Sequence, residues 1–542
     1  MSTNIVDKTP RSTVKFTQRK TVRLNGAYLM TTLGDRMWMF AIGIFMHKLG
    51  GMSWVAVQQF LDALLKLGTL PLLGTIMDKM NRRKVIQYSL ALNNVCVAIS
   101  ALCFCVCFYG WEGGALGYRI IPFTIAIVFA SASRVASEAQ RICFTKDWIV
   151  VITSSFPEEG VSLSQQNAFM SLIDQVSSII LPFFTGFMIE SFGWTISCTV
   201  IIIYNLCSWA IENYLLINLY DSAPALHKRV RTEEASDNEE QTSFSWRNSL
   251  RLYFQQSSWL AGFGLTLLYM TVLGFDNLAG SYGQKHGMSL SVLGGFRTAG
   301  SVLGALGAVT FGFLQPLVGL LWTAFIGLTW QNLFIFLSGT STILPGSPMN
   351  LTGYVDNFGV KSWLSGVVEH IQKPQNDDLE SVSFFQLPTS IILFFVGITL
   401  ARFGLWMADP AITQIQQETI PEAQRYSVFT MQTAFCEGFS LLKDTIVILF
   451  PNTELFGGLA IMSCIFVFTG YLFNIAYFLQ CGCSTKKDGH KPIQQTDVEM
   501  IEEPEKTSLL NHVEEKNEAN IIEEHNEKKE EIEIIDGNGE NE

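Results

Sequence analysis

The segment Gly74-Thr-Ile-Met-Asp-Lys-Met-Asn-Arg-Arg-Lys84 joins two long apolar runs, 53–77 and 86–109. Each run is long enough to cross a bilayer as a helix, because crossing the hydrocarbon core takes about 20 apolar residues. The segment between them is short and ends in three consecutive basic residues. Basic loops of this kind remain on the cytosolic side of a membrane. The segment therefore predicts a helical hairpin whose connection lies in the cytosol.

Long apolar runs recur along most of the chain, and about twelve of them reach the length that spans a bilayer. They occupy residues 24–46, 53–77, 86–109, 117–143, 162–189, 194–217, 256–283, 288–312, 316–340, 385–408, 426–450 and 455–479. Only 15% of the 542 residues are charged and 49% are hydrophobic, whereas soluble domains carry about 25% charged residues. The sequence therefore predicts an all-α membrane protein with twelve transmembrane helices.

Basic residues predict which side of the membrane each loop faces. The arm at residues 1–23 and the stretch 228–231 are basic, as is the loop after the second run, and even numbers of spans separate them. By the positive-inside rule all three lie in the cytosol, and twelve spans bring the C-terminus to the same side. The first run contains Asp35 and Arg36 and lacks a small-residue cleavage site, so we interpret it as a retained helix rather than a signal peptide.

The longest loop on the opposite side, 341–384, carries the tripeptide Asn350-Leu351-Thr352. Asn-x-Thr is an acceptor sequence for N-glycosylation in extracellular segments. We therefore expect this loop to be extracellular, with Asn350 as a glycosylation site.

Polar stretches divide the chain into five parts. We expect a cytosolic arm at 1–23, an N-terminal six-helix bundle at 24–218, a cytosolic linker at 219–252, a C-terminal six-helix bundle at 253–480 and a cytosolic tail at 481–542. From Ser484 onward the tail holds 18 acidic and 7 basic residues. The linker and the tail lack hydrophobic periodicity, so neither can bury a core, and we expect the tail to be disordered.

A candidate sorting signal lies in this tail. Glu505-Lys506-Thr507-Ser508-Leu509-Leu510 fits the acidic dileucine pattern that endocytic adaptors bind, with Glu505, Leu509 and Leu510 as its determinants. Such a pattern also arises by chance in acidic tails. The first interpretation predicts adaptor binding and endosomal or lysosomal traffic, and the second predicts neither.

The opening segment resembles the loop signature of the major facilitator superfamily, G-x-x-x-D-[RK]-x-G-x-[RK]-[RK]. It is shorter by one position and has Asn81 where the signature has its inner glycine. With six plus six helices, the resemblance implies two bundles that rock around a site near the bilayer midplane. Ordinary positive-inside charge is the alternative interpretation of the loop. To a gate at the cytosolic end we assign Asp78, Arg82, Arg83, Asp147 and Asn167.

Charged side chains within the apolar runs are costly and usually mark a pathway or a structural pair. Asp62 and Lys66 are four residues apart, as are Arg134 and Glu138. Residues at this spacing lie on one helix face, so we expect each set to form a local ion pair.

Other polar residues of the N-terminal half are rich in oxygen atoms. Asn93 and Asn94 lie in the middle of the third run, and Asn205 and Glu212 share a face of the sixth because two helical turns separate them. Carboxylate and amide oxygens suit a hard divalent cation such as Ca²⁺. No histidine lies inside any run, and His47 is only at the outer end of the first. A histidine-rich transition-metal site is therefore excluded from the bilayer core.

Seven blocks along the chain resemble the ferroportin family of the major facilitator superfamily. They are Gly34-Asp35-Arg36-Met37-Trp38, Lys146-Asp147-Trp148-Ile149-Val150-Val151, Ile173-Asp174-Gln175, Tyr269-Met-Thr-Val-Leu-Gly-Phe-Asp276, Pro345-Gly-Ser-Pro348, Ala401-Arg402-Phe-Gly-Leu-Trp406 and Val447-Ile-Leu-Phe-Pro-Asn452. They run in order through both halves and span about residues 24–480.

The resemblance implies export of Fe²⁺ by alternating access, with proton counter-movement, from a multi-pass protein of the plasma membrane. It also implies a calcium site in the N-terminal half that favours the outward-open state. The family's calcium ligands fall on Asp35, Asn94, Asn205 and Glu212, each identical here, and on Asn93, where the family has Gln. Asn offers the same amide oxygen on a shorter side chain.

The iron sites that the resemblance implies are altered. The N-terminal ligands fall on Asp35 and Asp174, but the family's histidine is replaced by Met39, whose thioether is a weaker ligand for Fe²⁺. The C-terminal Cys and His of vertebrate members fall on Asn277 and Lys443. Either Asp276, Glu437 and Asp444 supply replacement oxygens, or these acids neutralise Lys443.

These replacements bear on partners and on function. Loss of the C-terminal Cys predicts a weak or absent response to the peptide hormone hepcidin. We expect an exporter of Fe²⁺, with Co²⁺ or Mn²⁺ as further cargoes, because affinity order alone does not select iron. The alternatives are a receptor that kept the fold without transport, and a facilitator carrier for another solute. We find no nucleotide-binding loop, nucleophile elbow or catalytic metal motif, so an enzyme is not expected.

Overall fold

The computed structural model describes residues 20–109, 116–227, 246–275, 279, 282–283, 286–345, 347, 359–360, 363, 365, 386–450 and 455–487. The chain divides into two compact units, Met1–Phe478 and Leu479–Glu542. The site described below lies entirely within the first unit.

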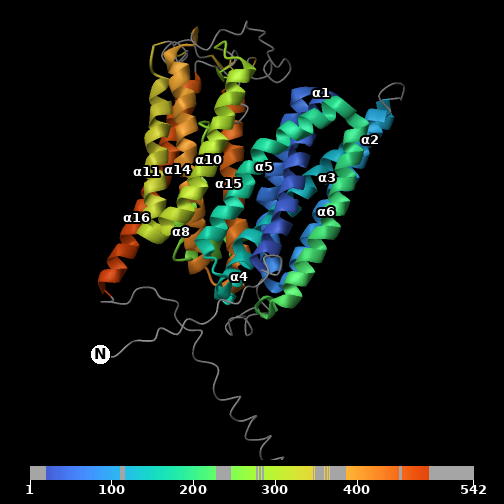
Figure 1. Ribbon diagram of the computed structural model, residues 1–542. Helices are drawn as coiled ribbons and strands as arrows, with labels where there is room; N and C mark the ends of the chain where they lie inside the picture. Colours follow the sequence, from blue (N-terminus) through green and yellow to red (C-terminus); the bar gives the residue numbers. More distant parts are fainter. Residues whose placement is uncertain are drawn as a thin grey trace, which may run out of the picture. The chain divides into compact units, whose positions relative to one another are not determined.

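The N-terminal half is built from long helices, coloured blue to green in Figure 1. They are α1 (Lys20–Lys79), α2 (Arg82–Tyr109), α3 (Leu116–Ile142), α4 (Ile149–Ser155), α5 (Leu163–Phe192) and α6 (Trp194–Ser222). Two short 3₁₀ turns cover Pro157–Glu159 and Pro224–Leu226. Between α3 and α4 the backbone adopts a π-helical turn, Cys143–Trp148, a feature that often accompanies functional sites.

The C-terminal half continues from α7 to α16, coloured green to red. Its helices are α7 (Trp246–Gln255), α8 (Trp259–Leu267), α10 (Leu290–Val318), α11 (Leu320–Ser341), α14 (Thr389–Thr419), α15 (Arg425–Leu449) and α16 (Phe456–Lys487), with a 3₁₀ turn at Glu422–Gln424. The two halves pack together mainly through α1 with α15 and α5 with α10.

The prediction of an all-α membrane protein is confirmed. Within the described residues, nine helices are long and apolar enough to cross a bilayer. They cover Trp54–Lys79, Arg82–Tyr109, Ile120–Ser155, Leu163–Phe192, Trp194–Ser222, Ser291–Val318, Leu320–Ser341, Thr389–Thr419 and Phe456–Cys481. Of the other three predicted runs, 24–46 lies within α1 and 426–450 matches α15, which leaves 256–283.

The prediction of one continuous helix over 256–283 is wrong. Helix α8 ends at Leu267, and the backbone from 268 to 275 is irregular. In this segment, side-chain hydroxyls accept backbone hydrogen bonds that helical carbonyls would otherwise accept. The Val272 amide donates to Ser463 Oγ of α16 at 2.9 Å, and the Leu273 amide donates to Thr271 Oγ1 at 3.0 Å. Irregular backbone at membrane depth is stable where it lines a cavity, as this segment does.

Candidate transport cavity and its closed end

A cavity of about 700 Å³ lies between the two halves. Its walls come from α1, α3 and α5 of the N-terminal half and from α8, α10, α11, α14, α15 and α16 of the C-terminal half. The irregular segment after α8 contributes Tyr269, Thr271 and Gly274. A discontinuous helix beside a cavity between two bundles is the usual setting of a transporter substrate site.

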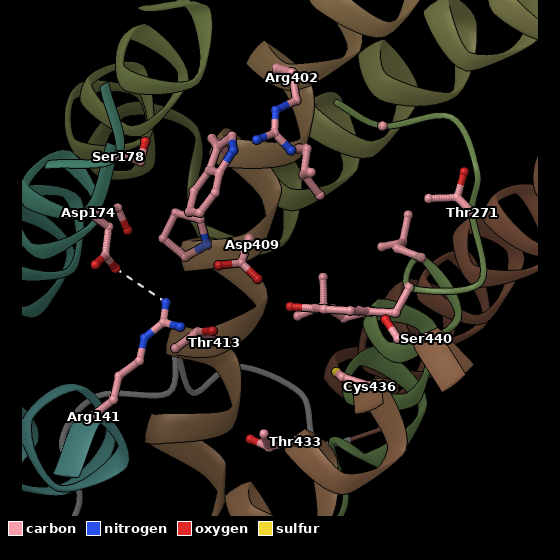
Figure 2. A pocket seen from close by; sticks show the side chains of 18 of the residues that line it. Arg141, Asp174, Ser178, Thr271, Arg402, Asp409, Thr413, Thr433, Cys436 and Ser440 are labelled. Carbon is pink, nitrogen blue, oxygen red and sulfur yellow. Dashed lines mark hydrogen bonds and ion pairs between the residues drawn. The ribbon is translucent and has the colours of Figure 1, made fainter. Parts of the chain in front are cut away.

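Asp174 of α5 links the three N-terminal helices that line the cavity, because its carboxylate contacts side chains of both α1 and α3. It accepts hydrogen bonds from Tyr28 Oη at 2.9 Å and from Arg141 at 3.2 Å, and Arg36 lies 3.7 Å from its other oxygen. Figure 2 shows Asp174 and Arg141 facing one another across the cavity wall. Two arginines therefore neutralise Asp174, and its oxygens are already engaged.

Lys66 lies at the junction of the halves, and the predicted local pair Asp62–Lys66 is not the pair that forms. Lys66 Nζ instead binds Glu437 Oε1 of α15 at 2.7 Å, while Asp62 accepts from Gln58 at 2.7 Å. Lys443 pairs with its neighbour Asp444 at 3.3 Å. Each lysine of the cavity wall near α15 thus has an acidic partner.

Asp409 of α14 and Lys146 of the π-helical turn face the cavity from opposite halves. They interact electrostatically, and Lys146 Nζ also donates to Thr413 Oγ1 at 3.0 Å. Asp409 and Thr413 are labelled in Figure 2, on the same helix. These contacts tie the π-helical turn to α14.

One end of the cavity is closed by a buried ionic network. Arg82 Nε donates to Asp147 Oδ2 at 2.8 Å, with side chains only 1% and 0% exposed. The same guanidinium binds Glu422 at 2.5 Å, and Tyr426 Oη donates to Asp147 at 2.8 Å. Arg425 lies 3.7 Å from Asp147. Since Glu422, Arg425 and Tyr426 belong to the C-terminal half, this network fastens the two halves together.

Asp78 supports the same closure by capping a helix of the other half. Its carboxylate accepts from the backbone amides of Tyr426 and Ser427 at 3.1 and 2.7 Å, and from the Ser427 hydroxyl at 2.5 Å. These amides are among the first of α15, which lack partners within the helix. An acid at this place also complements the positive end of the helix dipole.

Asn167 of α5 forms a further contact between the halves. Its amide donates to Gln417 Oε1 of α14 at 2.7 Å, and Gln417 returns a bond to Asn167 Oδ1 at 3.2 Å. Gln417 also donates to the Thr145 carbonyl at 2.5 Å, inside the π-helical turn. Arg83 differs from the other predicted gate residues, because it lies 3.8 Å from Asp221 of its own half.

The acids and amides predicted to bind calcium lie among α1, α2 and α6, where Asp35 is half-buried and the other four are buried. Asp35 accepts from Asn93 at 3.1 Å and from the hydroxyl of Ser137 of α3. Asp35 and Glu212 interact electrostatically. One Glu212 oxygen accepts from Ser208, and the other, Oε2, is buried without a hydrogen-bond partner among the described residues.

Asn94 and Asn205 orient their amides in the same way. Each Nδ2 donates to the carbonyl four residues earlier in its own helix, Leu90 at 2.9 Å and Ile201 at 2.8 Å. The nitrogen of each amide is thereby committed, and Oδ1 is the atom left to act as a ligand. The Asn205 oxygen would lie 3.7 Å from a Cβ on Gly34, next to Asp35 in the chain.

Of the three residues predicted for the N-terminal iron site, Asp174 alone is among the described residues that line the cavity. Asp174 lines the cavity, whereas Asp35 faces α2 and α3 through Asn93 and Ser137. Met39 is 37% exposed and, like Asp35, is not among the described residues that line the cavity. No group of three or more His, Cys, Asp or Glu side chains among the described residues is arranged to hold a metal.

Several predicted positions lie outside the described residues. They are Asp276 and Asn277 of the C-terminal iron site, the glycosylation site Asn350, and the sorting determinants Glu505, Leu509 and Leu510. Lys443 is described and lines the cavity.

Sequence reasoning missed the C-terminal partners of the gate, Gln417, Glu422 and Tyr426. They follow one another closely at the junction of α14 and α15, but no local motif marks them. Their only sequence signal is a polar stretch between two apolar runs, which is typical of any loop.

Comparison with known proteins agrees with this architecture. The model of the ferroportin family, described as Ferroportin1 (FPN1), matches residues 18–467. Solute carrier family 40 member 1 of Danio rerio is 29% identical, over 86% of this chain and 94% of that protein. Ferroportin of Homo sapiens is 29% identical, over 82% of this chain and 88% of that protein.

Solved structures share the fold. A bacterial homologue of the iron transporter ferroportin in an outward-facing state has a TM-score of 0.68 at 18% identity, covering 85% of this chain and 99% of that one. The Escherichia coli fucose:proton symporter FucP has a TM-score of 0.52 at 11% identity, covering 84% and 98%. The fold is therefore that of the major facilitator superfamily. The chain belongs to the ferroportin family, and it is a membrane transporter rather than an enzyme.

Proposed function

We propose that this protein exports ferrous iron from the cytosol. The observation that carries the proposal is the match to the ferroportin family over 18–467, which includes every helix that lines the cavity. The cavity between the halves supplies a place for the cargo near the middle of the bundle. Co²⁺ and Mn²⁺ are proposed as further cargoes, because first-row divalent ions compete for similar ligands.

Alternating access supplies the mechanism. The network of Arg82, Asp147 and Glu422 and the cap formed by Asp78 hold one end of the cavity closed. With twelve spans and cytosolic termini, this end faces the cytosol, so the state described is closed toward the cytosol. Breaking these contacts and forming others at the far end would expose the cavity to the cytosol. Asp78, Arg82, Asp147 and Asn167 are the gate residues in this proposal.

We propose a regulatory calcium site formed by Asp35, Asn93, Asn94, Asn205 and Glu212. The donor set fits Ca²⁺, which prefers carboxylate and amide oxygens. Glu212 Oε2 is buried without a hydrogen-bond partner among the described residues, and the amide nitrogens of Asn94 and Asn205 already donate to carbonyls of their own helices; both features favour a cation at this place. Because the ligands come from α1, α2 and α6, a bound cation would stabilise one packing of the N-terminal bundle.

Topology and location complete the proposal. Two six-helix bundles, 24–218 and 253–480, are joined by a cytosolic linker at 219–252, with a cytosolic tail from 481. The plasma membrane is the proposed location, and adaptor binding at Glu505, Leu509 and Leu510 would divert the protein to endosomes. Asn350 is the proposed glycosylation site in the extracellular loop 341–384.

Efflux of radiolabelled Fe²⁺ from loaded cells, with and without external calcium, tests the proposal. Wild-type protein is expected to release iron in a calcium-dependent way, and Asp35→Ala is expected to abolish release. Asp221→Ala is the matched control, because Asp221 is 58% exposed and pairs only loosely with Arg83. Retention of Fe²⁺, Co²⁺ and Mn²⁺ by surface-expressed wild type would contradict transport and favour a receptor.

A further inference from the structure

The cavity carries an excess of positive charge, which is unexpected for a cation pathway. Among its described lining residues eight are basic and four are acidic. The basic ones are Arg36, Lys66, Arg134, Arg141, Lys146, Arg297, Arg402 and Lys443, and the acidic ones are Glu138, Asp174, Asp409 and Glu437. A cavity lined by one sign of charge concentrates ions of the opposite sign.

The four acids are engaged with cations away from α10. Asp174 binds Arg36 and Arg141, and Glu437 binds Lys66. Glu138 interacts electrostatically with Arg141, Lys66, Arg134 and Arg36, and Asp409 does so with Lys146. The excess positive charge therefore lies on the wall formed by α10 and α14, where Arg297 and Arg402 line the cavity.

Two unsatisfied donors lie together on that wall. Arg402 Nε and Trp406 Nε1 are buried atoms without a hydrogen-bond partner among the described residues. They are one helical turn apart on α14, and the Arg402 guanidinium carbon lies 5.9 Å from the Trp406 ring centroid. Figure 2 shows the guanidinium of Arg402 turned into the cavity. Buried donors without acceptors cost free energy, which a bound acceptor would recover.

Arg297 of α10 adds a second guanidinium at the same wall. It lines the cavity, its side chain is exposed, and it interacts electrostatically with Arg402. No ion pair of Arg297 or Arg402 occurs among the described residues. Two like charges held together without a partner repel one another, and an anion between them would remove that repulsion.

We propose that Arg402, Trp406 and Arg297 form a binding site for a small carboxylate anion that accompanies the divalent metal through the cavity. A carboxylate matches the planar fork of an arginine with two parallel hydrogen bonds. The cavity volume suits an organic polycarboxylate, since small-molecule sites measure about 300–1,000 Å³. An anion at this wall also compensates the charge that would otherwise repel a bare divalent cation. The inference rests on the proposed export of iron.

The test measures binding of radiolabelled citrate to the purified full-length protein without metal, and then efflux of iron supplied with or without citrate. Citrate is expected to bind saturably, with a Kd of about 1 mM or tighter. Arg402→Gln and Arg297→Gln are each expected to weaken binding about tenfold, because each removes one charged donor. Arg247→Gln of α7 is the matched control, since this arginine is exposed and does not line the cavity.

Three results would overturn the inference: no saturable binding, unchanged affinity in the cavity variants, or displacement of citrate by an equal concentration of chloride. If Arg402→Gln fails to fold, the affinity of Arg297→Gln is compared with that of the wild type, because Arg297 is exposed and its substitution is less disruptive. The binding arm is independent of export. Iron efflux without citrate binding would reject the anion site alone. Citrate binding without efflux of iron in either form would reject the proposed iron export, and with it the role of the anion as a companion of the metal, but not the anion site itself. Enhanced efflux of iron with citrate, lost in Arg402→Gln and Arg297→Gln, would support a role of the bound anion in export.

Discussion

Lys66 of α1 and Glu437 of α15 form an ion pair of 2.7 Å that joins the two halves of the molecule across the cavity wall. Their side chains are 8% and 21% exposed, so the pair is largely removed from water. The two residues are 371 positions apart, and each has a nearer charged neighbour in the sequence. The packing of α1 against α15, rather than spacing along one helix, selects the partner.

Removing one member of this pair is expected to destabilise the protein more than removing both. Glu437→Gln leaves Lys66 buried without its partner, and we expect a loss of about 2 kcal/mol, below the 3–5 kcal/mol of fully buried pairs because Glu437 is partly exposed. The double variant Lys66→Gln/Glu437→Gln should recover part of it. Thermal unfolding of the purified protein measures both. If the stability loss of the double variant equals the sum of the losses of the two single variants, the two residues are not coupled and the prediction is contradicted.

Asp147→Asn is expected to open the closed end of the cavity. The substitution weakens charge-assisted bonds to Arg82 and leaves its guanidinium, 1% exposed, undercompensated. A cysteine placed at Thr145 reports the opening through its rate of reaction with a membrane-impermeant thiol reagent from the cytosolic side. We expect an increase of about tenfold or more. Asp221→Asn, in an exposed pair, should leave the rate unchanged; an equal increase there would show that the effect is unspecific.

Gly74→Ala is expected to impair transport by separating α1 from α15. A Cβ at Gly74 would lie 2.8 Å from the Tyr426 carbonyl oxygen and 2.9 Å from Ser427 Cα, and closer still to the Thr430 hydroxyl. Backbone atoms cannot move aside as a flexible side chain can, so the closed end would no longer pack. Gly68→Ala on the same helix is the control, because nothing lies within 4 Å of its Cβ. Comparing efflux of the two variants at equal surface expression checks this, and equal activities would refute it.

Glu212→Gln is expected to weaken calcium binding at least tenfold. Ca²⁺ affinity depends on the number of charged ligands, and this change removes one of two carboxylates while keeping the side chain's shape. Calorimetric titration of calcium into the purified protein measures the change. Asn213→Ala on the same helix is the control, because Asn213 only accepts a 3.4 Å bond from Gln87. Unchanged calcium affinity in Glu212→Gln would place the site elsewhere.

Hepcidin is expected to bind this protein weakly or not at all. The resemblance places the C-terminal Cys and His of vertebrate members at Asn277 and Lys443, so a metal that anchors the peptide would lack both ligands. Labelled hepcidin on surface-expressed protein tests this, with human ferroportin as the positive control. Saturable binding at concentrations of about 1 nM would contradict the prediction.

Which helices form could be predicted largely from the sequence. Apolar runs of about 20 residues must form helices in a bilayer, since no water is present to satisfy the backbone. Eleven of the predicted runs coincide with described helices to within a few residues, two of them within the single helix α1. The prediction for 256–283 is wrong because the length of an apolar run reports only how apolar a segment is. It cannot report that Ser463, almost 200 residues later, would accept the amide hydrogen bond of Val272.

The sequence by itself determined which segments form membrane helices, apart from 256–283, and the residue types at the candidate sites, because each depends on local composition. Tertiary structure decided the partners. Lys66 pairs with Glu437 instead of Asp62, and Asp78 accepts hydrogen bonds from the first amides of α15. Asp35 and Asp174 contact different neighbours, Asn93 and Tyr28 respectively. Long-range electrostatics and hydrogen bonding depend on distance in space, and that distance follows from how helices remote in sequence pack against one another.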